Sequence, residues 1–385
     1  MIIQSRNVWI QSHFVPAQLE LNGSKIRDIL PYETGTADLD YGDLRIVPGF
    51  IDIHTHGYAG WDTNDATPEG LRKWMNEIPS EGVTGICPTT ITQSYEVLAA
   101  AVRNVAGTVR KGYEGAEILG IHLEGPYLDQ KYKGAQPQQH VRPADLQEFQ
   151  CLQEEAEGLI RIITMACEHD PDYKLTEYCA SHGILVSQGH SSAAYEQALE
   201  ACAHGARSMT HVFNGMRGLH HREPGFAGAA LRMRDTYGEI ICDGIHVHPA
   251  VLNLFFHAKG RNLGIMVSDS LMAKGCPAGS HHLFGGNEIE IYPDGSAHLC
   301  TTGGLAGSTL KINRGLQILC EQAGVPFESA LNACTINPAR ALGIDDRKGM
   351  LCTGYDADIT VLGSNYDVVQ TFVRGRAWMI GTGKR

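Results

Sequence analysis

Side chains that commonly bind metal ions stand at the ends of strand-like runs along this sequence, and this arrangement constrains the fold most strongly. Imidazole and carboxylate groups are the usual ligands of a hydrolytic divalent metal, and the carboxyl ends of parallel strands are where a (β/α)8 barrel keeps its chemistry. In chain order these side chains are His54, His56, Glu124, His190, His211 and Asp269. The pattern therefore predicts a metallohydrolase.

The pair His54 and His56 makes this prediction more specific than any single residue could. Alternation along a strand sends residues i and i+2 to the same face, so both imidazoles point into the barrel mouth while Thr55 points away. A lone His beside an apolar strand is more often an ordinary core residue. Five runs that all end in metal-competent residues favour a site instead.

From Gly49 onward, apolar runs alternate with helix-length segments, which is typical of a closed parallel barrel. One such segment, residues 191–205, predicts a helix capped by Ser191 or Ser192 and stopped by Gly205. The expected strands are residues 49–56, 82–90, 116–124, 160–168, 184–190, 208–214, 239–247 and 263–270.

Both ends of the chain consist of short alternating runs separated by Gly, Pro and Asp, as in hairpins. We expect residues 1–48 and 346–385 to pair into one small β-sandwich domain. Residues 49–345 would then form the catalytic (β/α)8 TIM barrel, so the fold class is α/β with a flanking sandwich.

Composition excludes several classes of protein. The formal net charge of -12 argues against a nucleic-acid or anionic-membrane binder, because such proteins need a basic surface. The eleven cysteines are odd in number and form no C-x-x-C pair, so we do not expect a disulfide framework. We expect a cytoplasmic, reducing location instead. We expect neither an export signal nor a membrane segment, since no run of about 18 apolar residues occurs.

Several motifs carry a family resemblance, in order across most of the chain: PGFIDIHTHG, HLEGPYL, GHSSA, THVFNGM, REPGFAGAAL, CDGIHV, and SDS followed by GGLAGS. Together they resemble the N-acetylglucosamine-6-phosphate deacetylases of the amidohydrolase superfamily. The resemblance implies hydrolysis of the N-acetyl amide of a sugar phosphate to glucosamine 6-phosphate and acetate, in amino-sugar catabolism or cell-wall recycling.

The resemblance also implies roles for the predicted ligands. Glu124, His190 and His211 would bind the main metal, and Asp269 would act as general base and acid beside a metal-activated hydroxide. Because the first-strand pair is retained, a second ion bridged by Glu124 is expected, which gives one or two divalent ions per subunit. His/carboxylate ligation suits Zn, Fe(II), Co, Mn or Ni.

One position departs from the family pattern. After HLEGPYL the family usually has Lys-Gly-Ala-His, whereas this chain ends that motif in Gln136. A Gln amide can donate a hydrogen bond to the acetyl carbonyl but cannot carry charge. We therefore expect the second metal to take over part of the carbonyl polarisation.

Phosphate recognition falls to a small set of residues. Arg222 offers a guanidinium fork that matches phosphate, and His246 is its expected companion. Backbone amides of Asn214 and Gly215 could cradle phosphate oxygens. In the resembling family the Arg and His can come from the neighbouring subunit, which implies a homodimer with shared active sites.

Other candidates are weaker. The loop residues Leu305, Ala306 and Gly307 are expected to close over the sugar, and His122 is expected in the core or behind the ligands. The pairs in polar loops are expected to be surface residues: His220, His221, His281 and His282.

The alternatives are a deacetylase for the galactosamine epimer, another amidohydrolase such as a dihydroorotase or hydantoinase, and a non-catalytic scaffold. Cyclic amidases usually bridge their metals with a carboxylated Lys, whereas Glu124 takes that place here. A scaffold would have lost ligands, and this chain has lost none. The orientation of one sugar hydroxyl leaves no mark in the sequence, so the epimer stays open.

Overall fold

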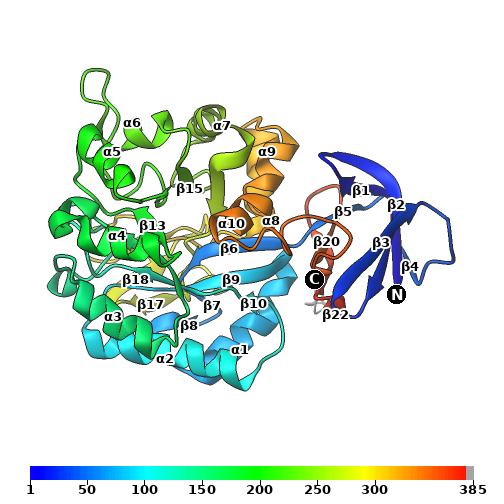
Figure 1. The fold of residues 1–385 in the computed structure, drawn as a ribbon, viewed down its shortest axis with the longest axis horizontal. Coiled ribbons are helices and arrows are strands. Elements are labelled where there is room, and N and C mark those ends of the chain that lie inside the picture. Colours follow the sequence, from blue (N-terminus) through cyan, green and yellow to red (C-terminus); the bar gives the residue numbers. More distant parts are fainter. Residues whose placement is uncertain (379–385) are drawn as a thin grey trace.

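A parallel barrel forms the larger body of the computed structural model, which describes residues 1–378 (Figure 1). Eight strands run round it, with the short β10 (Glu117–Ile118) as a ninth beside β9. A parallel bridge between Thr55 and Ser270 links the first strand to the segment after the last. In spatial order the strands are β6 (Phe50–Thr55), β9 (Val83–Thr90), β11 (Ile121–Glu124), β12 (Ile160–Met165), β13 (Leu185–Gln188), β14 (Ser208–Met209), β15 (Tyr237–Ile241) and β16 (Gly264–Val267). The predicted barrel is confirmed.

Helices cover the outside of the barrel, and each buries an apolar stripe against it. In α2, for example, Leu98, Val102 and Val105 share one buried face. The helices are α1 (Pro68–Glu77), α2 (Tyr95–Lys111), α3 (Leu146–Glu155), α4 (Lys174–Ser181), α5 (Tyr195–Ala203), α6 (Gly225–Arg232), α7 (Pro249–Leu263), α8 (Ile312–Gln317), α9 (Phe327–Asn332) and α10 (Ile336–Ala341). Short helical turns lie at 63–65, 78–81, 138–140, 167–169, 171–173 and 318–322.

Strands from both chain ends build the flanking sheet, as expected (Figure 1). They are β1 (Ile2–Ile10), β2 (His13–Asn22), β3 (Lys25–Pro31), β4 (Leu39–Asp40), β5 (Arg45–Pro48), β20 (Ile359–Leu362), β21 (Val368–Val373) and β22 (Arg376–Trp378). Ile3 and Leu19 from the head pack with Ile359 and Phe372 from the tail in one core. Domain boundaries at 48/49 and 345/346 stay a prediction, and 379–385 lie outside the described residues.

A small antiparallel sheet lies over the barrel mouth: β17 (His281–Phe284), β18 (Asn287–Ile291) and β19 (Ala297–Leu299). Nearby, β7 (Gly57–Tyr58) pairs with β8 (Trp61–Asp62). Phe284 and Ile289 of the small sheet pack on Leu271, which follows β16. Asn287 Nδ2 also donates to the carbonyl of Ala135 at 2.9 Å. These contacts hold the small sheet against the loops that carry the site.

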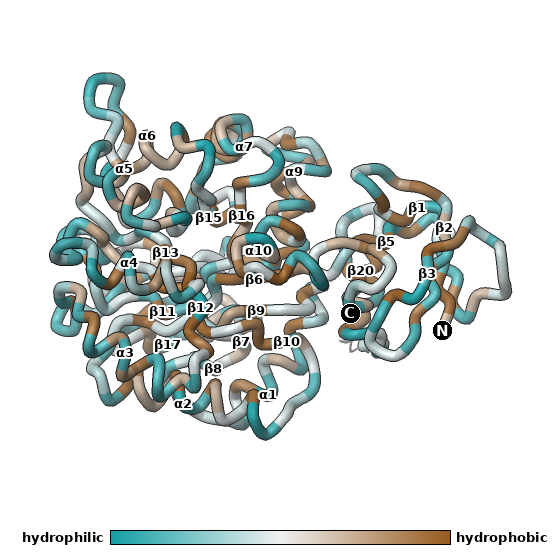
Figure 2. The backbone as a smooth tube through the Cα atoms, in the orientation of Figure 1, coloured by the Kyte–Doolittle hydropathy of each residue, from teal (hydrophilic) through white to brown (hydrophobic). Residues whose placement is uncertain are grey.

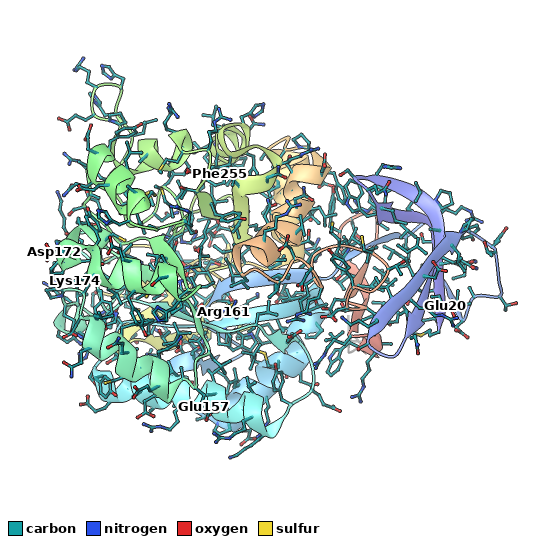
Figure 3. All side chains as sticks on the ribbon, in the orientation of Figure 1. Glu20, Glu157, Arg161, Asp172, Lys174 and Phe255 are labelled. Atoms are coloured by element: carbon teal, nitrogen blue, oxygen red, sulfur yellow. The ribbon has the colours of Figure 1, made fainter. Side chains whose placement is uncertain are left out.

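Hydrophobic and charged residues divide as a globular fold requires. Hydrophobic segments concentrate on the central strands and on the flanking sheet (Figure 2). Phe255 points inward from α7, whereas Glu157 and the ion pair of Asp172 with Lys174 lie at the periphery (Figure 3). Within residues 1–378, none of the helices combines the length and the apolar character that crossing a bilayer requires.

The predicted cap of α5 is wrong, although its stop is confirmed. The helix begins at Tyr195, and the side chains of Ser191 and Ser192 bond to Glu168 instead. Because these hydroxyls donate to the Glu168 carboxylate, they do not cap the N-terminus of the helix. Gly205 follows the last turn with a φ of +114°, which favours glycine.

Candidate active site

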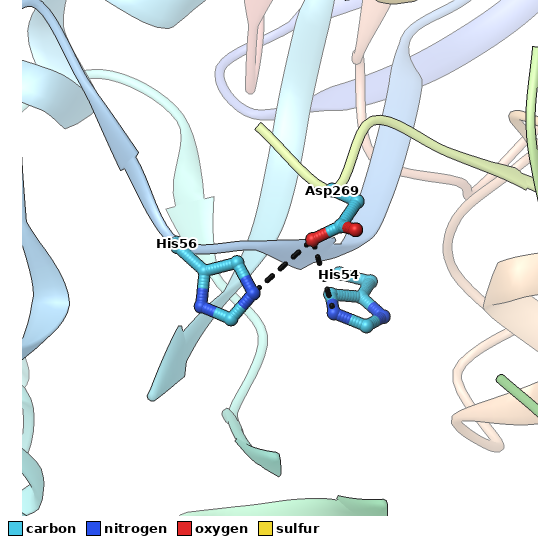
Figure 4. Close-up of side chains that lie close together, drawn as sticks. All are labelled: His54, His56 and Asp269. Carbon is cyan, nitrogen blue, oxygen red and sulfur yellow. Dashed lines mark ion pairs between the residues drawn. The ribbon is translucent and has the colours of Figure 1, made fainter. Parts of the chain in front are cut away.

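The predicted ligands converge at the carboxyl ends of the barrel strands. His54 comes from β6 and His56 from the position just after it, Glu124 from the end of β11, and the others from the turns after β13, β14 and β16. They form two groups, and within each group the potential ligand atoms lie within 4.8 Å of one another. One group is His54, His56 and Asp269 (Figure 4), and the other is Glu124, His190 and His211.

Glu124 connects the two groups. Its Oε1 lies 3.2 Å from His190 Nε2 and 3.3 Å from His211 Nε2. The same oxygen lies 3.3 Å from His54 Nε2, and Oε2 lies 3.3 Å from His56 Nε2. This carboxylate therefore contacts ligand-type atoms of both groups and would help to hold a cation in either.

Asp269 faces the first-strand pair (Figure 4). Its Oδ1 lies 3.2 Å from His56 Nε2 and 3.5 Å from His54 Nε2. Asp269, His190 and His211 all adopt positive φ, at 48°, 48° and 26°. Such conformations cost about 1–3 kcal/mol each in a non-glycine residue and gather at functional sites. The strained turns aim these side chains at one point.

Electrostatics within the cluster couple the imidazoles to the carboxylates. Burial lowers the pKa of His54, but Glu124 and Asp269 together raise that pKa well above its usual value. Burial also lowers the pKa of His56, but hydrogen bonds to Asp269 and Glu124 outweigh it and raise that pKa to about 9. Burial raises the pKa of Glu124, yet His54 and the hydrogen bonds from His190 and His211 bring it well below the ordinary range. The carboxylates thus stay ionised and attract positive charge.

The donor set fits a divalent metal. Within residues 1–378, His54 Nε2 is buried without a hydrogen-bond partner, although it faces two carboxylate oxygens. A cation among these atoms would satisfy that nitrogen. Four imidazoles and two carboxylates suit a first-row transition metal, and the two groups suit one or two ions.

Backbone carbonyls orient two of the ligands. His190 Nδ1 lies 2.8 Å from the carbonyl oxygen of Tyr132, and His211 Nδ1 lies 3.1 Å from that of Asn214. Donation from Nδ1 leaves Nε2 free to bind a metal. His122 differs, because both of its ring nitrogens contact protein oxygens and burial keeps its pKa well below the usual value. It is a neutral core residue.

A pocket of about 140 Å³ opens beside the cluster. His54 and Ala306 are fully buried and are not among the residues that line it, and the expected closure of the Ala306 loop over the sugar stays a prediction. Predicted residues that line the pocket are His56, Glu124, Gln136, His190, His211, Asn214, Gly215, His246, Asp269, Leu305 and Gly307. The sequence missed Gly134, Ala135, Ile241 and Phe284, which also line it.

Gln136 is fixed at the edge of the cluster. Its Oε1 accepts a hydrogen bond from the Thr92 N–H at 2.8 Å, and its Nε2 donates to Glu124 Oε2 at 2.6 Å. The amide therefore holds the bridging carboxylate, and only its second N–H is available to a substrate.

The expected phosphate cradle needs a correction at Asn214. Its backbone N–H donates to the carbonyl of His211 at 2.9 Å, so this amide is already used. The side-chain Nδ2 is buried in the pocket wall, has no hydrogen-bond partner among the described residues 1–378, and can serve as a donor instead. Gly215 has a φ of +57°, and a Cβ there would lie 2.8 Å from His190 Nδ1, so only glycine fits.

The two expected phosphate partners lie apart within one chain. His246 lines the pocket, and its Nδ1 lies 2.6 Å from Asp243 Oδ2. Burial lowers the pKa of His246, but Asp243 raises it above the usual value. Arg222 is exposed, contacts His221 at 2.8 Å and lines a separate surface depression with Arg217.

Imidazoles and carboxylates gathered at the carboxyl ends of a parallel barrel define a metal-dependent hydrolase of the barrel class. The chain belongs to the amidohydrolase family, whose profile matches residues 45–378.

Known relatives narrow this class. The N-acetylglucosamine-6-phosphate deacetylase of Bacillus subtilis is 40% identical over 336 residues, which cover 86% of this chain and 84% of that protein. The N-acetylgalactosamine-6-phosphate deacetylase of Escherichia coli O157:H7 is 33% identical over 368 residues, or 96% and 95% of the two chains. The solved N-acetyl-D-glucosamine-6-phosphate deacetylase of Mycobacterium smegmatis has a TM-score of 0.93 at 28% identity and covers 98% of this chain and 100% of its own.

Proposed function

We propose that this chain hydrolyses the N-acetyl amide of N-acetylglucosamine 6-phosphate and releases glucosamine 6-phosphate and acetate. The observation that carries the proposal is the convergence of six ligand-type residues around Glu124 beside a small pocket. The Bacillus relative at 40% identity carries a name for the same reaction.

His54, His56, Glu124, His190, His211 and Asp269 would hold one or two divalent ions, which when bound polarise a carbonyl and lower the pKa of a water molecule. Asp269 moves the proton: it accepts one from the attacking water and delivers it to the departing amine nitrogen. Burial raises the pKa of Asp269, but His54 and His56 bring it below its usual value, so the residue begins as the required base.

Residues of the pocket wall position the substrate. The unpartnered Nδ2 of Asn214 can donate to a sugar or phosphate oxygen, and His246 supplies a further donor. Leu305 and Gly307 close the pocket from the loop after β19. Gln136 keeps Glu124 in place and offers its second N–H to the acetyl oxygen.

We further propose a homodimer in which Arg222 of the partner subunit completes the phosphate site. Arg222 lies outside its own pocket, yet an acidic chain needs added positive charge to hold phosphate. Leu219, in the same loop, is 59% exposed, and elsewhere on the barrel body Ile245 and Leu254 are 42% and 63% exposed; such apolar residues suit burial between two copies.

A cytoplasmic location is proposed on the state of the cysteines. All eleven are free thiols, and Cys87, Cys167 and Cys334 are among those buried in the barrel body. A reducing compartment maintains such thiols.

One experiment tests the reaction. Purified protein of measured metal content would receive N-acetylglucosamine 6-phosphate, its galactosamine epimer and dihydroorotate in parallel, with acetate release as readout for the sugars. The glucosamine compound should react fastest, and removal of its phosphate should cost about 1.5–3 kcal/mol for each lost charge-assisted contact. Equal turnover of the unphosphorylated sugar would contradict the phosphate site.

The second candidate is the galactosamine epimer, which the Escherichia coli relative favours because it matches 96% of this chain. Faster turnover of the epimer in the same panel would select this candidate. Turnover of dihydroorotate alone would reject both.

A further inference from the structure

Glu239 is a buried carboxylate for which the proposed reaction has no use. It lies in β15 and its side chain is 0% exposed. Oε2 lies 3.0 Å from His54 Nδ1, and within residues 1–378 Oε1 has no hydrogen-bond partner. A buried carboxylate with so few partners costs free energy. Its presence in the barrel interior therefore calls for a functional reason.

The two ring nitrogens of His54 face different partners. Nδ1 faces Glu239, whereas Nε2 faces Glu124 at 3.3 Å and Asp269 at 3.5 Å. A carboxylate only accepts hydrogen bonds, so the proton stays on Nδ1 and the lone pair of Nε2 can bind a cation. A carboxylate behind a ligating histidine fixes the orientation and the tautomer of the ring.

The other ligand-type histidines lack such a partner. His190 and His211 donate Nδ1–H to neutral backbone carbonyls, and Nδ1 of His56 is buried and has no partner in the described part of the chain, residues 1–378. Within the first-strand pair, orientation therefore depends on the contact between His54 and Glu239.

We propose that Glu239 is a positioning residue. By orienting His54, it enables His54 and His56, together with Asp269, to bind a second cation. Its charge and hydrogen bond hold Nε2 of His54 toward Asp269 and increase the basicity of that nitrogen. Glu239 itself does not line the pocket, although Ile241, two residues later on the same strand, does. This inference rests on the proposed function in one respect: it assumes that the same site binds metal ions.

The test uses ion affinity as its readout. Zn²⁺ would be titrated into the metal-free full-length protein, with stoichiometry checked by elemental analysis. Glu239→Leu should weaken the second, first-strand site by about 10- to 100-fold, as for other carboxylates behind ligating histidines. Glu239→Gln keeps an acceptor of equal reach without the charge, so its loss should be smaller. The site at Glu124, His190 and His211 should keep its ion in both.

Ser208→Ala is the matched control, because Ser208 lies buried in the adjacent strand β14 and its hydroxyl has no hydrogen-bond partner among residues 1–378. It should leave both affinities unchanged. Melting temperatures of the metal-free proteins separate positioning from packing: a packing role lowers them without changing ion affinity. Wild-type affinity for two ions in both Glu239 variants would overturn the proposal.

The outcomes also separate this inference from the function. Two ions bound, with the expected loss in the Glu239 variants, support the positioning role even if no acetate is released. A wild-type protein that binds a single ion overturns it, whatever its activity.

Discussion

Asp269 is the residue on which the proposed proton transfer depends. Asp269→Asn should lower turnover by about a hundred- to ten-thousand-fold, because an amide cannot shuttle a proton. Metal content should stay close to wild type, since an amide oxygen can still ligate weakly. Steady-state kinetics and elemental analysis check both parts, with the exposed Asp172→Asn as control. Near-normal turnover would remove Asp269 from the mechanism.

His54 and His56 should matter more here than in a chain with His at position 136. Changing them to Asn and Gln should lower the metal stoichiometry from about two to about one, because two nitrogen ligands are lost. Activity should fall sharply, and added Gln136→His should restore part of it. Gln136 already contacts Glu124 Oε2, so an imidazole there would stand beside the reacting centre. Unchanged stoichiometry and turnover in the double variant would reject the compensation.

Among single residues, the sequence predicts those whose side-chain type alone indicates a metal ligand. His54, His56 and Glu124 belong to that group, because a strand end and a metal-type side chain are enough to mark them. Glu239 was missed although it stands in an apolar run on the same strand face as Ile241. The signal that could have identified it is a charged residue within a strand that is otherwise apolar and buried.

The small sheet over the pocket makes an element-scale prediction. Phe284 of β17 is 3% exposed, lines the pocket and meets the His56 ring edge-on at 5.2 Å. Phe284→Ala should lower kcat/KM by about ten- to a hundredfold, because a loosened wall misplaces the reacting groups. The neighbouring Leu283 is 69% exposed, so Leu283→Ala is a matched control with little effect. Equal losses in the two variants would mean that the sheet contributes only stability.

The elements differ in how far local sequence determines them. The barrel strands were predictable, because burial on both faces demands continuous apolar runs such as β16. The cap of α5 could not be predicted, because the hydroxyls of Ser191 and Ser192 donate to Glu168, which is distant in sequence. Phe284 likewise reaches the pocket through packing between segments, which no local pattern records.

A partly buried group of charged residues joins the barrel to the flanking sheet. Glu117 in β10 lies 2.8 Å from Arg347 and 2.8 Å from Lys348, close to Asp356 of the tail. Burial raises the pKa of Glu117, but Arg347 and Lys348 lower it below its usual range. Its contribution to stability is therefore complete above the unfolded-state pKa, about 4.3, and is lost as the pH falls through the lower folded-state value.

Glu117→Gln should lower the free energy of unfolding at pH 7 by about 1–3 kcal/mol, because it takes a charged partner from the buried Lys348 and the partly buried Arg347. The difference from wild type should shrink below about pH 4, where the wild-type carboxyl becomes protonated. Denaturant unfolding across this range measures it. Glu114→Gln is the control, since Glu114 and Arg376 form a pair that is 64% exposed on both sides and worth less than about 1 kcal/mol. A difference that does not shrink as the pH falls would contradict the assignment.

The position of Arg222 could not be predicted from the sequence, because a loop motif does not say which subunit it serves. The structure places this residue outside its own pocket, so the proposed phosphate contact requires a second chain. Arg222→Ala should raise KM for the phosphorylated sugar strongly, through loss of a guanidinium–phosphate contact worth about 1.5–3 kcal/mol. Arg217→Ala, in the same depression, is the control.

Mixed dimers decide whether Arg222 acts across the interface. Subunits carrying Arg222→Ala would be mixed with subunits carrying Asp269→Asn, each nearly inactive alone at low substrate concentration. If the sites are shared, the pocket with an intact Asp269 receives Arg222 from the other subunit. Random exchange makes about half of the dimers mixed, each with one intact site of two, so about a quarter of wild-type activity should return. If Arg222 serves its own pocket, each site of the mixed dimer lacks one residue and no activity returns.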